Sequence, residues 1–227
     1  MPHQSFNYLL IPILFGIFTI HVYGESPIYF WRVSDLARSS VENIKLRNEQ
    51  DRLIKTVSAK QMVYLYAAMS SIAEASEIHA EFFIVDGKLA NAFAGSTEDG
   101  LNFVAINFSM LDILGTDLDM AAALIGHELA HLKLNHGEMS KKNIELNRGK
   151  DFSAANTRYS RDNEREADYL GAIWAVEAGY NPSGAVALQE ALYTHSKKAA
   201  SLSFNASHPS SIERITILKS LVRRLSY

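Results

Sequence analysis

The amino-acid sequence predicts an α+β fold that is mainly helical, with a small β-sheet packed beside one buried helix. Short segments with the pattern of strands fall within residues 82–108, whereas apolar residues at helical spacing recur before and after that region. Apolar residues make up 48% of the chain and charged residues 21%, which excludes extensive disorder and a polytopic membrane protein. A length of 227 residues suits one domain with its own core.

Residues 1–24 read as a unit apart from this domain. Their apolar stretch, residues 8–23, is short for a membrane span of about 20 residues, and Val22-x-Gly24 suits a signal peptidase. We therefore expect a signal peptide, with residues 25–227 exported as a single domain to the periplasm. Because no Lys or Arg precedes the apolar stretch, an uncleaved membrane anchor is the alternative.

The expected elements begin with two helices and continue with three strands. Residues 33–56 are polar with scattered apolar side chains, which indicates an exposed first helix, and residues 59–77 have the spacing of an amphipathic helix. Residues 95–100 resemble a hairpin loop, because Gly begins and ends this polar segment. The expected strands are Phe82–Val85, Leu89–Ala94 and Leu101–Phe108.

Four helices are expected after the sheet. The first has Asp117 and Asp119 at its start, where the helix dipole favours negative charge. Asn181-Pro182 is a cap followed by proline, which opens the third helix. No element is predicted for the polar residues 138–158 and 197–208. The four helices span residues 117–136, about 160–178, about 182–195, and a last segment that starts at Pro209.

Residues 127–131 of the first of these helices form a His-Glu-x-x-His motif. Residues four apart on a helix lie on the same face, so His127 and His131 can bind one metal ion, with Glu128 beside it as general base. The chain has no cysteine, so such a site must consist of His, Asp and Glu. Since the surrounding sequence is apolar on nearly all sides, the helix is buried, and a metal would satisfy its polar residues.

The third metal ligand must come from another segment. A third histidine on the same segment would need Gly and His where the chain has Leu134 and Gly137. On the next helix Glu164 and Asp168 are four residues apart and share a face, whereas Glu166 points about 200° away from Glu164. We predict that Glu164 completes a catalytic zinc site and that Asp168 accepts a hydrogen bond from a ligand histidine.

Five motifs follow one another along the chain: Asn91-Ala92-Phe93, Gly126 to His131, Glu164-x-x-x-Asp168, His208-Pro209 and Arg214. In this order they resemble the zinc metallopeptidase family of HtpX, BepA and the CAAX prenyl protease. The resemblance covers roughly residues 60–225. It implies a minimal gluzincin fold, one Zn²⁺ ion and peptide-bond hydrolysis, and it implies that the strand near Asn91 borders the cleft and pairs with an extended substrate.

The remaining histidines are judged one by one. His208 follows a polar segment, and the resembling family has such a histidine near its metal. It would either close the site as a fourth ligand or donate a hydrogen bond to the oxyanion, for which Arg214 is a second candidate. We expect His79, His136 and His195 to be surface or cap residues.

These observations predict a zinc-dependent endopeptidase in which Glu128 activates a zinc-bound water, with exported or misfolded envelope proteins as substrates. The net charge of −3 gives no general attraction to nucleic acid. Membrane contact is expected only through an uncleaved amino-terminal segment. One alternative is a chaperone-like zinc-binding quality-control factor with little proteolysis, and another is a zinc hydrolase of non-peptide amides; Glu128 favours catalysis over the first.

Overall fold

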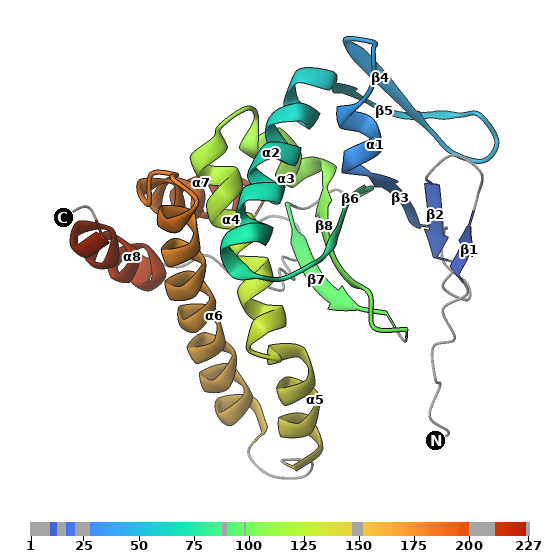
Figure 1. Ribbon diagram of the computed structural model, residues 1–227. Coiled ribbons are helices and arrows are strands. Elements are labelled where there is room, and N and C mark those ends of the chain that lie inside the picture. Colours follow the sequence, from blue (N-terminus) through green and yellow to red (C-terminus); the bar gives the residue numbers. More distant parts are fainter. Residues whose placement is uncertain are drawn as a thin grey trace.

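The computed structural model describes residues 10–12, 17–20, 28–87, 90–97, 99–146, 152–199 and 212–225. A sheet lies on one side of the molecule, and the longest helices lie on the other (Figure 1). The predicted α+β class, mainly helical with a small sheet, is confirmed. Within the described residues, no helix is both long and apolar enough to cross a membrane.

The main sheet is mixed and places one edge strand beside the central helix. β6 and β8 are parallel, and the other neighbouring strands are antiparallel. β7 forms one edge of the sheet and contacts α4. In order across the sheet the strands are β1 (Leu10–Pro12), β2 (Ile17–Ile20), β3 (Ile28–Arg32), β6 (Glu81–Val85), β8 (Asn102–Asn107) and β7 (Ala92–Ser96).

The central helix is α4 (Leu118–Lys133), which packs against β7, α2, α6 and α7. Asp117 caps it by accepting a hydrogen bond from the backbone N–H of Met120. Residues 121–130 are all buried, so the expectation of a buried motif helix is confirmed. The other long helices are α2 (Ala59–Ser76), α6 (Phe152–Glu177), α7 (Ser183–Ala199) and α8 (Ile212–Leu225).

The helix expected over residues 33–56 is wrong. Only α1 (Val33–Ala37) is helical there, and β4 (Asn43–Arg47) pairs with β5 (Leu53–Ser58) in a separate two-stranded sheet. The side chain of Asn48 accepts hydrogen bonds from two backbone N–H groups of the turn between them. This local turn and the alternation of apolar and polar residues favour a hairpin over a helix.

Two further helices were not expected. α3 (Phe108–Leu114) follows β8 directly, capped by the side chain of Asn107, which accepts from the N–H of Met110. The helix predicted over residues 117–136 ends at Lys133, and α5 (His136–Leu146) extends into residues 138–158, for which no element was predicted. α6 begins at Phe152 rather than near residue 160. Because α5 is mostly polar, it has no apolar stripe to reveal it.

The strands β1 and β2 lie within residues 1–24, the expected signal peptide. Cleavage of that segment stays a prediction.

Candidate metal centre

The site forms where α4 and α6 come unusually close. A Cβ atom added to Gly126 would lie 2.7 Å from the carbonyl oxygen of Gly171, and one added to Gly171 would lie 2.6 Å from the backbone nitrogen of His127. Any larger residue at either position would therefore push the helices apart. The close approach brings carboxylates of α6 to the histidines of α4.

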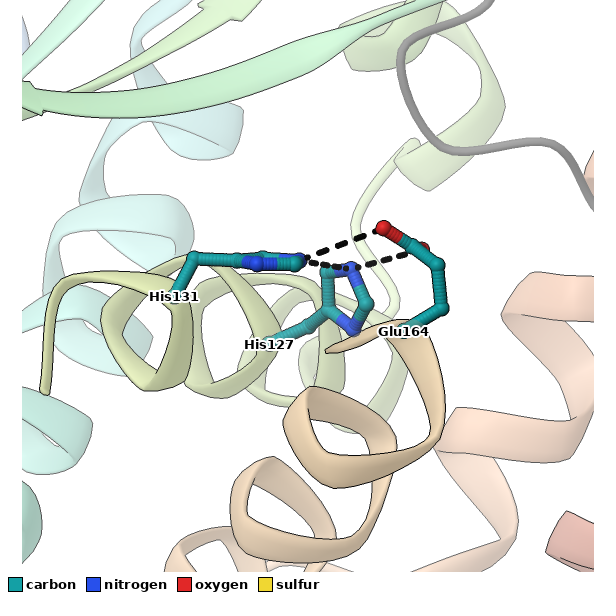
Figure 2. A group of neighbouring side chains, drawn as sticks. All are labelled: His127, His131 and Glu164. Carbon is teal, nitrogen blue, oxygen red and sulfur yellow. Dashed lines mark hydrogen bonds and ion pairs between the residues drawn. The ribbon is translucent and has the colours of Figure 1, made fainter. Parts of the chain in front are cut away.

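Three side chains from these helices converge on one point (Figure 2). The Nε2 atoms of His127 and His131 are 3.1 Å apart. The two carboxylate oxygens of Glu164 approach one histidine each, at 3.4 Å from His127 Nε2 and 3.4 Å from His131 Nε2. Glu166 does not join this group, and its side chain is 64% exposed.

The spacing of these atoms fits a zinc ion. Nitrogen and oxygen ligands bind zinc at about 2.0–2.2 Å, so two ligands of a tetrahedral ion lie about 3.3–3.6 Å apart. The two histidine nitrogens are 3.1 Å apart, and each lies 3.4 Å from one oxygen of Glu164, within about 0.2 Å of that range. Two imidazoles and one carboxylate also form a ligand set known for catalytic zinc, in which a fourth position stays open.

The buried charge of the site also fits a divalent cation. In the part of the chain that the structure describes, the buried charged side chains are Glu128, Glu164, Asp168 and Arg214, and all four surround this point. Three carboxylates and one guanidinium leave two negative charges uncompensated when the histidines are neutral. Buried charges require partners, and one Zn²⁺ ion supplies the missing two.

A buried ionic network stands behind His127. Its Nδ1 atom lies 3.0 Å from Asp168 Oδ1. Arg214 donates to both oxygens of Asp168, at 2.9 and 2.7 Å, and its third nitrogen lies 2.8 Å from Glu164 Oε2. Burial lowers the pKa of His127, but the hydrogen bonds and charges of Asp168 and Glu164 outweigh it and raise the pKa to about 10. The two carboxylates therefore favour a positive charge on the imidazole of His127.

A different network stands behind His131. Its Nδ1 atom lies 2.8 Å from His136 Nδ1, and His136 Nε2 lies 3.3 Å from Glu166 Oε2. His136 is only 4% exposed and is the first residue inside α5, so the expectation of a surface or cap residue is wrong. The chain turns back at Asn135, which has a positive φ of 54°. Sequence patterns offered little sign of this contact, because His136 follows the end of the motif helix.

A family-wide sequence model described as Peptidase family M48 matches residues 59–148 and 150–222. The match spans more than half of the chain. The chain belongs to peptidase family M48. The family consists of zinc metalloendopeptidases, so the predicted enzyme class and the sequence resemblance are confirmed. A search of curated proteins found no significant match.

The catalytic motif of this M48 peptidase includes a carboxylate that is not part of the three-residue group. Glu128 is 1% exposed and borders two cavities. One cavity also reaches Phe93, His131 and Glu164. The other extends between α4, α6 and α7, past Leu124 and Leu188. Glu128 therefore lies beside the zinc-site group and lines both cavities.

The predicted substrate strand lies at the same cleft. Asn91 and Ala92 border one of these cavities, and Phe93 borders the other. The backbone N–H of Asn91 donates to the side chain of Asn107, and its carbonyl accepts from the N–H of Asn107, which holds the start of β7 in place. His208 lies outside the described residues, so its expected role stays a prediction.

Proposed function

We propose that this M48 peptidase cleaves polypeptides with zinc held by His127, His131 and Glu164, and with Glu128 as general base. The observation that carries the proposal is the convergence of His127, His131 and Glu164, each with one ligand atom within 4.8 Å of the others, beside the buried carboxylate of Glu128. A bound zinc ion would supply a Lewis acid that lowers the pKa of water and polarises the scissile carbonyl.

The protein side chains then have separate tasks. Glu128 accepts a proton from the attacking water on its carboxylate and returns it to the leaving amine. Asp168 accepts the Nδ1–H of His127 and thereby keeps Nε2 directed at the metal. Arg214 was a candidate oxyanion donor, but its guanidinium contacts Asp168 and Glu164 with three nitrogens. That engagement favours a role in positioning these carboxylates.

The edge strand β7 supports an extended polypeptide as the substrate. Among the described strands β7 pairs only with β8, so its other edge offers backbone groups to a further strand. The cavities that border Glu128 also border Asn91, Ala92 and Phe93. A substrate strand there would place a peptide bond near the carboxylate. This edge also favours peptides over non-peptide amides.

The first experiment measures zinc content and casein cleavage by the full chain and by Glu128→Gln. The variant should fold and hold one zinc per chain but lose activity by about 10²–10⁴-fold, because an amide cannot accept the proton. Glu138→Gln makes the same change on exposed α5 and should behave as the wild type. If Glu128→Gln cleaves casein at the wild-type rate, the general-base role is wrong. A zinc-loaded wild type that binds unfolded casein without cleaving it would support the chaperone-like alternative.

The apolar segment of residues 8–23 supports export. Exported or misfolded envelope proteins would then be the natural substrates. Expression in a Gram-negative host followed by cell fractionation tests this. The periplasmic fraction should contain a chain whose mass corresponds to a start at Glu25. A full-length chain in the membrane fraction would support the anchor, and one that stays in the cytoplasm would contradict export.

A further inference from the structure

We propose that His136 is a positioning residue that holds the zinc ligand His131 in its binding orientation. The inference rests on the proposed zinc site and goes beyond it, because His136 belongs to no part of the motif. It assigns one partner to each nitrogen of the two imidazole rings: zinc to Nε2 of His131, and a hydrogen bond to each of the other three nitrogens.

The two rings lie in contact and nearly perpendicular. Their centroids are 4.9 Å apart and their planes make an angle of 71°. The short contact joins the two Nδ1 atoms at 2.8 Å, which is a hydrogen-bond distance. His131 therefore presents Nε2 to the three-residue group and Nδ1 to His136, so each nitrogen has one distinct neighbour.

Metal binding fixes which atom carries each proton. A histidine that binds zinc through Nε2 carries its remaining hydrogen on Nδ1. That N–H of His131 then donates to Nδ1 of His136, which must be the acceptor. His136 in turn carries its hydrogen on Nε2 and donates it to Glu166 Oε2, 3.3 Å away. One arrangement of protons thus satisfies all three side chains.

The backbone conformation at Asn135 positions His136 for this contact with His131. His136 is the first residue of α5, and the turn at Asn135 returns the chain toward the end of α4. Met139 donates its backbone N–H to the carbonyl of Asn135, which ties the turn to α5. A buried imidazole in this position costs entropy and desolvation, and two hydrogen bonds offset that cost.

The experiment compares three replacements of His136 in the full chain by competition for zinc with a chelator. Asn places its oxygen where Nδ1 of the imidazole was, whereas Gln places its polar group near Nε2. His136→Asn should bind zinc within a few-fold of the wild type. His136→Gln and His136→Phe should lose about 10–100-fold in zinc affinity, because the acceptor for His131 is gone. His79→Phe makes the same change on an exposed residue and should leave zinc affinity unchanged.

A second measurement separates positioning from simple packing. The unfolding midpoint of each metal-free variant should follow side-chain volume, with no special advantage for Asn, whereas zinc affinity should favour Asn over Gln. Equal zinc affinity of the Asn and Gln variants would overturn the inference, whether or not His136→Phe folds. A wild type that takes up no zinc would overturn the proposed metal site itself. Wild-type zinc binding together with unchanged binding by all three variants would overturn the role of His136 alone.

Discussion

The two histidines of the motif are equivalent in the sequence but have unequal support in the fold. Behind His127, Asp168 and Arg214 form an ionic network in which Arg214 is 6% exposed. Behind His131, the imidazole of His136 leads to Glu166, whose side chain is 64% exposed. Ionic hydrogen bonds are stronger out of water than at a solvated surface. The comparison shows that one candidate zinc ligand has a stronger support than the other.

The largest effect on stability is expected when Arg214 is removed from the buried ionic network behind His127. Arg214→Met leaves Asp168 and Glu164 buried without their guanidinium, which should lower the free energy of unfolding of the metal-free protein by about 3–5 kcal/mol. Denaturant titration measures this, and added zinc should recover part of the loss. Arg224→Met on the exposed face of the same helix is the control. A loss no greater than that of the control would show that the buried network contributes little.

The next largest effect is expected when Asp168, the hydrogen-bond acceptor of His127, is removed. Asp168→Ala should lower zinc affinity by about 10–100-fold, and by more than any replacement of His136. Chelator competition on both sets of variants makes the comparison direct. If the His136 variants lose more affinity than Asp168→Ala, the ranking of the two supports is reversed.

The raised pKa of His127 predicts that zinc affinity depends on pH. Because this pKa lies at about 10 in the metal-free protein, the imidazole is protonated at neutral pH and zinc must displace that proton. Apparent affinity should therefore rise by about tenfold per unit from about pH 7 to about pH 9. In Asp168→Ala the slope should flatten, because a cause of the raised pKa is gone. An equal slope in both proteins would assign the proton to another group.

The smallest effect on zinc affinity is expected at Glu166, the exposed residue that His136 contacts. Glu166→Gln keeps an acceptor for His136 and removes only a solvated charge, which is worth about 0–1 kcal/mol. Zinc affinity should change by about fivefold or less. Glu177→Gln, at the far end of the same helix, should have no effect. A loss as large as that of His136→Phe would mean that the carboxylate, and not the imidazole, holds His131.

Much of the fold was predictable where a local pattern repeats. The spacing of apolar residues predicted α2 and α4, and three short apolar runs predicted β6, β7 and β8, although β7 begins at Ala92 rather than Leu89. The hairpin β4–β5 and the polar helix α5 were missed. The residues of the hairpin were assigned the period of a helix instead of that of a strand. The helix α5 has no apolar stripe by which it could be recognised.

The sequence by itself determined which residues can face a metal on one helix, because the pitch of a helix sets the relation between His127 and His131 and between Glu164 and Asp168. Only the tertiary structure decided how the two helices meet, through the contact of Gly126 with Gly171. It also decided that Arg214 holds Asp168 and that His136 holds His131. These contacts depend on how separate helices pack and on a turn of the backbone, and neither leaves a periodic trace in the sequence.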